Sequence, residues 1–528
     1  MKARFKSPQL AVILLLLILG AVPFLPGLKA PFFYDDHNII VLNPAIQKEQ
    51  NPLRFFRELE SFSAQRVPML RPLVVLSYWW NWRWFGENTF GWRVVNLSFH
   101  LLCLVLVYFL VWELSGSVGL GFLSGLFFAL HPSRVVPVIY LSARSELLAS
   151  FFYLASFLLF RRTMKTKSRM SIFFGVLSFL GFGLGLFCKS IVITLPAVLT
   201  LERLFFRRLD KKSLFWLGIF WAGALGYFFL RQFFELYTFF PPARPRPVWE
   251  NLLLQARALV YYLRWLIFPV HPTVEAKFTP INYLEAGASI FLLVLLAGAG
   301  IYLFIRGSLI GFFLLWFFVL LAPSSSFIPL VVEASLTRCY LASLGIFFLF
   351  ACGVFWLVRL LFLRRKILVI FFAGVIYLSL GILSFSWSEK WNHPTQLWKE
   401  TLKSFFHHWR AHNNLGLLLK NQGNFSQAER EFLWAIDFNP KDSSALNNYA
   451  QLLWAEGEEE RAEEYFIRSL SADPGNCSAR LAYSEFLLKK GRIEQAGRLV
   501  SGMDFCPLHQ KELWKIKKEI QAIQNPKR

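Results

Sequence analysis

The chain has 528 residues, of which 55% are hydrophobic and 17% are charged, with 58 Phe and 19 Trp among them. This composition excludes an ordinary soluble globular protein, because the apolar residues occur in blocks long enough to cross the roughly 30 Å hydrocarbon core of a bilayer. The net charge of +23 suggests a polyanionic partner, but the basic residues cluster between the apolar blocks, as the positive-inside rule predicts. We therefore predict an integral membrane protein and expect no nucleic-acid partner.

The first apolar block runs from Leu10 to about Leu28 and follows three basic residues, Lys2, Arg4 and Lys6. A cleaved signal peptide begins in the same way. No small-residue cleavage site follows this block cleanly, however, so we expect an uncleaved helix with a cytoplasmic N-terminus. Residues 29–91 then form a long loop on the opposite, non-cytoplasmic side.

This loop contains two adjacent carboxylates, Asp35 and Asp36. Most Asp-Asp pairs are solvated turn residues. This pair lies only a few residues beyond an apolar segment, near the membrane surface, where an uncompensated charge is costly and usually has a function. At the end of the loop, the Trp-rich run Tyr78–Phe85 is typical of a segment that lies along the membrane surface. We interpret this run as an interfacial anchor rather than a sugar-stacking platform.

Ten further apolar segments bring the predicted number of transmembrane helices to about eleven. They are residues 92–112, 118–130, 147–160, 171–188, 191–206, 213–230, 286–305, 309–321, 339–358 and 367–385. Another apolar stretch, 251–270, contains Arg257 and Arg264 and is flanked by prolines, which favours an interfacial helix. With eleven spans, the basic runs after the fourth and sixth fall in the cytoplasm. The C-terminal part then lies on the same side as Asp35, in the periplasm or the lumen, and the membrane is an inner, plasma or ER-like one.

From about residue 388 the composition becomes polar, and small residues and prolines recur every 34 residues. Gly423, Gly457 and Gly491 keep this spacing, as do Pro440 and Pro474. This period is typical of tetratricopeptide repeats, which stack into α-solenoids and bind partners. We predict a multi-spanning membrane domain at residues 1–387, a linker helix at 388–408, about three repeats at 409–510 and a basic C-terminal tail at 511–528.

The chain has six cysteines, and none of them shows metal-ligand spacing. Cys477 and Cys506 lie in the repeat-containing part, where the sequence leaves open a disulfide or two free thiols. The other four lie in or beside apolar segments, and we interpret them as small hydrophobic residues.

A transferase that uses a lipid-linked sugar needs a base for the acceptor hydroxyl and cations for the departing phosphate. A carboxylate at the membrane face suits the first task. For the second task, we select basic residues in non-cytoplasmic loops, because they run against the charge trend of the chain. They are Arg71, Arg134, Arg144, Lys189 and Arg338. Contact with a lipid headgroup explains any single one of them equally well.

Four further polar residues are secondary candidates, namely Asn96, His100, His131 and Glu146. Asn96 and His100 share a helical face with Arg93, and hydrogen bonding between helices explains them as well as catalysis does. His131 and Glu146 belong to the same loop motifs as Arg134 and Arg144. The sequence leaves open whether a divalent metal such as Mg²⁺ or Mn²⁺ takes part, with Asp36 as a metal ligand or a hydrogen-bonding partner.

In this order, the motifs resemble those of the transmembrane-and-tetratricopeptide-repeat (TMTC-like) O-mannosyltransferase family, in the C-type glycosyltransferase superfamily. The resemblance covers nearly the whole chain. Its motifs are Tyr34–His37, Arg71–Leu73, Arg93–His100, Leu130–Leu148, Cys188–Pro196 and Leu397-Trp398. Two positions depart from the family pattern: Ser190 follows Lys189 where the family usually has an acidic residue, and the motif at 338–343 is one residue shorter.

The resemblance implies an α-helical C-type fold and a transferase that moves a sugar from a polyprenyl-phosphate donor to a hydroxyl on the non-cytoplasmic face. It implies that Asp35 and Asp36 serve catalysis and that the repeats recruit an exported acceptor protein or another partner. We expect Asp35 to be the base, and Lys189, Arg144 and Arg338 to neutralise the leaving phosphate. Two alternatives remain: an O-antigen ligase or polymerase that uses lipid-pyrophosphate glycans, and a non-enzymatic, membrane-anchored repeat scaffold.

Overall fold

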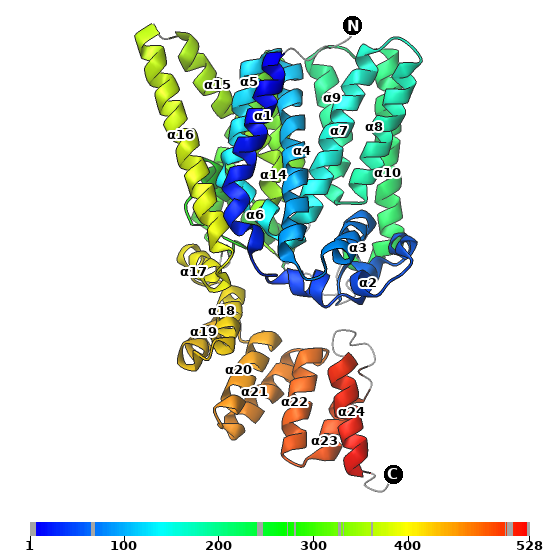
Figure 1. Cartoon of the computed structure of the whole chain (residues 1–528), viewed down its shortest axis with the longest axis vertical. Helices are drawn as coiled ribbons and strands as arrows, with labels where there is room; N and C mark the ends of the chain where they lie inside the picture. Colours follow the sequence, from blue (N-terminus) through cyan, green and yellow to red (C-terminus); the bar gives the residue numbers. More distant parts are fainter. Residues whose placement is uncertain are drawn as a thin grey trace. The chain divides into compact units, whose positions relative to one another are not determined.

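The computed structural model describes residues 7–64, 69–239, 246–271, 273–278, 281–325, 329–330, 332–360, 363–501, 503 and 510–524. These residues form helices joined by loops, as predicted (Figure 1). The chain divides into two compact units. Unit 1 extends to Asn392, apart from two short loop segments that begin at Ser63 and His271. Unit 2 consists of these segments and of the chain from His393 onward.

Unit 1 is a bundle of apolar helices with further helices in its connections. The helices of the bundle are α1 (Ser7–Ala21), α4 (Thr89–Ser115), α5 (Val118–Leu130), α7 (Arg144–Lys165), α8 (Met170–Leu186), α9 (Leu195–Phe205), α10 (Lys211–Phe239), α11 (Val248–Ile267), α12 (Tyr283–Ile305), α13 (Leu309–Leu321), α15 (Leu344–Leu360) and α16 (Leu363–Lys390). The helices in its connections are α2 (Pro44–Gln47), α3 (Pro72–Phe85), α6 (Val135–Ile139) and α14 (Cys339–Ala342). Helices α1, α4 and α5 pack together, and α7 lies against α4 and α8 (Figure 1).

Within the described residues, six helices are long and apolar enough to cross a membrane, or up to eight if each of two bent helix pairs forms one span. The bends are 61° between α5 and the segment Pro132–Ile139, and 57° between Leu336–Ala342 and α15. The chain is thus an integral membrane protein, and the number of eleven spans stays a prediction. Helix α11 is not among the candidate spans, and its interfacial position also stays a prediction.

The predicted span at 191–206 does not form one continuous helix. It begins with a tight 3₁₀ turn, Ser190–Thr194, and continues as α9, which has 11 residues. Such a helix is only about 16 Å long, roughly half of the hydrocarbon thickness. Its last turn carries the buried charged residues Glu202 and Arg203.

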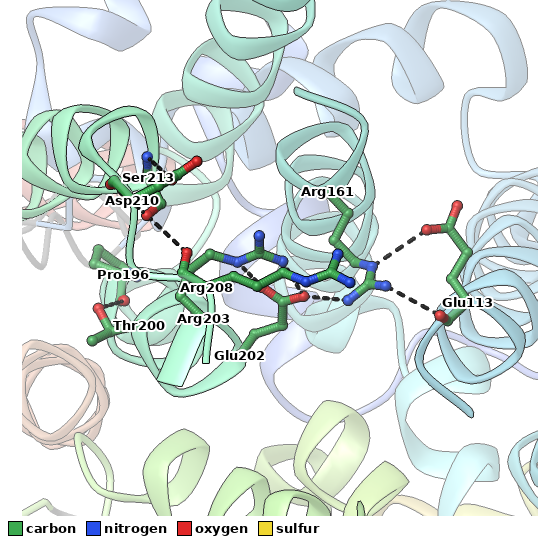
Figure 2. A network of polar contacts seen from close by, with 9 residues as sticks. All are labelled: Glu113, Arg161, Pro196, Thr200, Glu202, Arg203, Arg208, Asp210 and Ser213. Carbon is green, nitrogen blue, oxygen red and sulfur yellow. Dashed lines mark hydrogen bonds and ion pairs between the residues drawn. The ribbon is translucent and has the colours of Figure 1, made fainter. Parts of the chain in front are cut away.

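Charged networks lie near both ends of α4. Near its start, Arg93 donates hydrogen bonds to the loop that carries Asp36, through the carbonyls of Ala30 and Pro31 (2.7 Å to Pro31). Near its end, Glu113 accepts from Arg161 at 3.3 Å and is thereby joined to the network drawn in Figure 2. Arg93 and Glu113 are about 30 Å apart along the helix, at a rise of about 1.5 Å per residue. This separation matches the thickness of the hydrocarbon core.

The network in Figure 2 joins the ends of α4, α7 and α9. Arg161 of α7 lies between two carboxylates, because it also pairs with Glu202 of α9. Arg203 pairs with the same carboxylate, and Lys165 pairs with Glu113 at 2.6 Å. Each carboxylate therefore has two cationic partners, which offsets the cost of burying Glu202 completely.

Close helix packing in unit 1 depends on glycine where α15 meets α13. A Cβ atom on Gly345 would lie 2.2 Å from the carbonyl oxygen of Phe313, which is a backbone atom that cannot easily move away. The rings of Phe313 and Phe348 stack beside this contact, with 4.1 Å between their centroids. Small residues let membrane helices approach closely and gain van der Waals contact.

Unit 2 confirms the predicted repeats. Its helices are α17 (Pro394–Ser404), α18 (Trp409–Asn421), α19 (Phe425–Phe438), α20 (Ser443–Ala455), α21 (Glu459–Ala472), α22 (Cys477–Lys489), α23 (Ile493–Val500) and α24 (Gln510–Gln524). Gly423, Gly457 and Gly491 follow the first helix of each pair with φ of +79°, +86° and +74°. Glycine adopts this left-handed conformation without steric cost, and it commonly ends helices in this way. The 34-residue period is therefore the spacing of these turns. Helix α17 lies in the predicted linker, and α24 in the predicted tail.

Unit 2 also contains a disulfide-bonded cysteine, which bears on the redox state of its compartment. Cys477, at the start of α22, is disulfide-bonded. Cys506, the other cysteine predicted for this part, lies outside the described residues.

Candidate active site

Asp36 is an internal anchor of unit 1. Its Oδ1 accepts hydrogen bonds from the backbone N–H and the hydroxyl of Ser142, at 2.8 and 2.5 Å, and its Oδ2 accepts from the N–H of Phe33 at 3.1 Å. The side chain is fully buried. Burial raises the pKa of Asp36 to about 6, and the hydrogen bonds from Ser142 and the charge of Arg93 oppose this rise. Asp36 therefore fastens the loop to the start of α7 and is enclosed by the chain itself.

Asp35 has a different environment, although it is the next residue. Its side chain is only partly buried, and its backbone N–H donates to the hydroxyl of Tyr140 at 3.2 Å. The preceding residue, Tyr34, has a φ of +50°, a conformation uncommon for a residue with a side chain. This turn directs the two carboxylates into different surroundings. Of the pair, Asp35 is the residue with a partly exposed side chain.

Arg144 is predicted to bind phosphate, but the structure shows it connecting helices. Its guanidinium is completely buried and donates to Asn96 Oδ1 at 2.7 Å and to the carbonyls of Trp92 and Ser77 at 3.0 and 3.3 Å. The secondary candidate Asn96 is thus the partner of Arg144. Neither side chain is exposed to a ligand, so the geometry does not support a phosphate-binding role for Arg144.

Arg134 is buried in the same way. It donates to the hydroxyls of Ser133 and Ser343 at 2.8 and 2.7 Å and to the carbonyl of Tyr340, and it lies over the Tyr340 ring at 4.7 Å. His131 and His100 complete this polar core. His131 contacts Ser133 at 2.9 Å, and His100 contacts the Tyr340 hydroxyl at 2.8 Å. These side chains hold helices together and do not reach solvent.

Three of the predicted cations remain accessible, and Glu146 lies among them. Lys189 forms an ion pair with Glu146, whose side chain is 4% exposed, whereas that of Lys189 is 21% exposed. Burial lowers the pKa of Lys189, Glu146 opposes this change, and the charges of Arg71 and Arg338 lower the pKa further. Both arginines are therefore close enough to act on the charge of Lys189. We call these four residues, Arg71, Glu146, Lys189 and Arg338, the cation cluster.

The two arginines of the cation cluster differ in their partners. Arg338 donates to the carbonyls of Val332 and Glu333 at 2.8 and 3.2 Å and is partly exposed. Arg71 stands at the start of α3, with its guanidinium 5.0 Å from the centre of the Phe62 ring. Within the described residues, Arg71 has no hydrogen bond or ion pair from its side chain. It is the cation most available to an incoming anion.

Tyr78 connects the carboxylates with the cation cluster. It is completely buried, and its hydroxyl donates to the carbonyl of Leu141 at 2.8 Å. Burial raises the pKa of Tyr78, and the charges of Arg144, Asp36, Arg71 and Asp35 all act on it. Leu141 lies between Tyr140, whose hydroxyl contacts Asp35, and Ser142, which holds Asp36, so Tyr78 lies beside both carboxylates. Arg71 stands immediately before α3, seven residues ahead of Tyr78.

The interfacial position of the Trp-rich run stays a prediction, and the structure adds that the run has a buried face. The run forms most of α3, and its faces differ: Tyr78 and Trp79 are buried, whereas Trp80 and Trp84 are 44% and 66% exposed. One face of α3 therefore belongs to the core beside the site. Tyr140 and Ser142 contact the carboxylates, and Tyr78 contacts the segment between them, but none of the three was predicted as a site residue. Tyr140 and Ser142 lie within the motif Leu130–Leu148, and Tyr78 begins the Trp-rich run.

A metal site has no support from the described residues, where no group of three or more His, Cys, Asp or Glu side chains could hold an ion. Both oxygens of Asp36 accept hydrogen bonds from the chain, which favours the hydrogen-bonding alternative for this residue.

The fold and the site together define a helical, multi-spanning membrane protein with an accessible carboxylate, a cation cluster and a C-terminal repeat array. A family model described as tetratricopeptide repeat matches residues 413–477. The chain is also similar to the protein O-mannosyl-transferase F38B6.6 of Caenorhabditis elegans, at 28% identity over 167 residues, or 30% of this chain and 24% of that protein. Human protein O-mannosyl-transferase TMTC1 matches at 32% identity over 170 residues, or 29% and 19%. Mouse TMTC2 matches at 30% identity over 206 residues, or 37% and 24%.

These matches confirm the predicted resemblance over about a third of the chain, where it is similar to TMTC-type protein O-mannosyl-transferases. They span at most about a quarter of these relatives' own lengths. Among solved structures, ArnT from Cupriavidus metallidurans bound to undecaprenyl phosphate overlaps 98% of this chain and 88% of its own, with a TM-score of 0.37 and 13% identity. Because this overlap is loose, it supports no inference about a ligand.

Proposed function

We propose that the protein is a membrane glycosyltransferase that moves a sugar, mannose in the first instance, from a polyprenyl-phosphate donor to a hydroxyl of an exported protein. The similarity to O-mannosyl-transferases supports the reaction class. The observation that carries the proposal is that Asp35, which is partly exposed, and Lys189 both contact the short segment 140–146, Asp35 through the Tyr140 hydroxyl and Lys189 through Glu146. The reaction takes place on the non-cytoplasmic face, and the repeats recruit the acceptor or another partner.

In this mechanism, Asp35 accepts the proton of the acceptor hydroxyl as that oxygen attacks the anomeric carbon of the sugar. The bond between that carbon and the phosphate oxygen breaks, and the phosphate leaves with the electron pair. Arg71, Lys189 and Arg338 stabilise the charge that develops on this oxygen. Attack from the face opposite to the departing phosphate inverts the configuration of the anomeric carbon.

The charge of the cation cluster favours a monophosphate donor over a pyrophosphate donor. Three cations and Glu146 leave a net charge of about +2, which matches the one to two negative charges of a lipid monophosphate before and after transfer. A lipid-pyrophosphate glycan carries about two negative charges, and the lipid pyrophosphate left after transfer carries about three, which exceeds the charge of the cluster. An O-antigen ligase or polymerase is therefore the second candidate function, and the donor distinguishes the two.

The experiment measures sugar transfer to a Ser/Thr-containing peptide by the purified full-length protein, with polyprenyl-phosphate mannose or a lipid-pyrophosphate glycan as donor. We expect transfer from the monophosphate donor only, and we expect Asp35→Asn to abolish it without a change in thermal stability. Asp437→Asn, on the exposed surface of α19, serves as the matched control and should keep full activity. Unchanged activity of Asp35→Asn would exclude Asp35 as the base. Transfer from the pyrophosphate donor alone would favour the second function.

A further inference from the structure

Glu146 is an unexpected component of a site that binds an anion. It lies in the first turn of α7, its side chain is almost completely buried, and its carboxylate pairs with Lys189. The charges of Arg71 and Arg338 also act on Lys189. A fixed carboxylate among three cations repels a phosphate and occupies one of the cations that would bind it. Phosphate binding alone gives no reason for Glu146 to be there.

The charge change during the proposed reaction supplies a reason. The donor is a phosphodiester with one negative charge, whereas the spent lipid phosphate is a monoester with a charge of about −1.5 to −2 at pH 7. A purely cationic site would therefore bind the product more tightly than the donor and would retain it after transfer. A carboxylate that competes for Lys189 offsets this difference, because it regains its partner when the product leaves.

We propose that Glu146 is an internal competing anion, which holds Lys189 while the site is empty and assists the release of the spent lipid monophosphate. This role rests on the proposed function, because it takes a lipid monophosphate as the anion of the site. In the empty site Lys189 donates to Glu146, as in the structure. When phosphate enters, Lys189 transfers its hydrogen bond from Glu146 to the phosphate, and when phosphate leaves, the ion pair re-forms. No covalent bond changes in this exchange.

The test is direct binding of undecaprenyl phosphate to the purified full-length protein, measured by displacement of a fluorescent polyprenyl phosphate. We expect Glu146→Gln to bind undecaprenyl phosphate about fivefold more tightly than the natural chain, which corresponds to about 1 kcal/mol at 1.4 kcal/mol per tenfold change. The gain should be smaller for a phosphodiester analogue of the donor, which carries less charge. Glu87→Gln, an exposed residue just before α4, removes the same charge outside the cluster and should leave binding unchanged.

The outcomes separate this role from the proposed function. If the natural chain binds undecaprenyl phosphate and Glu146→Gln binds it no more tightly, the competing role is wrong while the donor site stands. If neither chain binds it, both proposals fail. A purely structural role of Glu146 would weaken binding on its removal, so a gain in affinity distinguishes the two. Should Glu146→Gln fail to fold, Glu146→Asp, whose shorter side chain draws the carboxylate back from Lys189, tests the same point and should also bind more tightly.

Discussion

Asp35 and Asp36 are neighbours in the chain, yet they meet different physical environments. Asp36 has three hydrogen bonds and no solvent, whereas Asp35 keeps an exposed side. A buried carboxyl favours its neutral form, which is why burial dominates the pKa of Asp36. Protonation of Asp36 therefore changes the stability of the fold. The partly exposed side chain of Asp35 is the one that can react with a substrate.

The raised pKa of Asp36 predicts how stability changes with pH. The pKa is about 6 in the folded state, against an ordinary value of 3.8. Between these values the folded state holds a proton that the unfolded state has lost, so this group makes the free energy of unfolding fall as pH rises from about 4 to about 6. The fall amounts to roughly 3 kcal/mol. Thermal unfolding in detergent, followed by Trp fluorescence across this range, should show it.

Asp36→Asn should flatten this part of the pH profile, because asparagine does not titrate. Asp437→Asn, which removes an exposed carboxylate, should leave the profile as it is. An Asp36→Asn profile with the same slope as that of the natural chain would contradict the assignment.

Removing the charge of Arg71 should impair donor binding without loss of stability, whereas removing the charge of Arg144 should lower stability. Arg71 has no polar partner among the described residues, so Arg71→Gln should leave the melting temperature unchanged. It should raise the KM for the lipid donor roughly tenfold or more, as expected for loss of a charge-assisted hydrogen bond. Arg144→Gln should instead destabilise the protein by roughly 1–3 kcal/mol, because it leaves buried acceptors such as Asn96 Oδ1 unpaired. Melting curves and donor kinetics of both variants check this. Equal destabilisation by the two changes would contradict the division into anchors and accessible cations.

The sequence could supply the candidate residues of the site but not this division. Loop position and charge identified Asp35, Lys189 and Arg71, since these depend on local composition. Burial of Arg134 and Arg144 depends on partners that are distant in the chain: Ser343 for Arg134 and Asn96 for Arg144. No local pattern reports such contacts, so exposed and buried arginines look the same in the sequence.

At the scale of helices, Gly345 and Gly353 form a matched pair within α15. A Cβ on Gly345 would collide with the backbone of α13, whereas a Cβ on Gly353 would meet nothing within 4 Å. We therefore expect Gly345→Ala to force the helices apart and to cost roughly 1–3 kcal/mol, as overpacking typically does. Gly353→Ala should not lower stability. Thermal unfolding of the two variants tests the packing, and equal melting temperatures would contradict it.

The helices also show why some elements were predictable and others were not. The repeats of unit 2 were predicted with their period, because each turn requires a glycine at the same place and the pattern is local. Spans were harder to count. The chain bends by 61° after α5 and by 57° before α15, and α9 is short and ends in buried charges. An apolar run in the sequence reports burial, but it does not report where the helix axis changes direction.

At the scale of the whole molecule, the orientation in the membrane decides whether the proposal stands. The disulfide of Cys477 favours an oxidising, non-cytoplasmic compartment for unit 2, because cytosolic thiols are kept reduced. A membrane-impermeant maleimide added to intact cells should therefore label Cys477, but only after its disulfide has been reduced. An engineered cysteine at the exposed Ser168, in the basic connection between α7 and α8, should react only after permeabilisation. If both sites react from the same side of the membrane, the proposed location of either the repeats or the basic connection is wrong.

Polar contacts near both ends of α4 make this helix a rigid spacer. Arg93 ties one end to the acidic loop, and Glu113 ties the other to Arg161 of α7, which also pairs with Glu202 of α9. The depth of Asp35 relative to the headgroups is therefore set by the length of α4 rather than by the conformation of a flexible loop. A bilayer whose hydrocarbon layer is much thicker or thinner would tilt or strain that spacer. Lipid chain length thereby becomes a determinant of how well the reacting carboxylate and the phosphate of a membrane-borne donor meet at the same height.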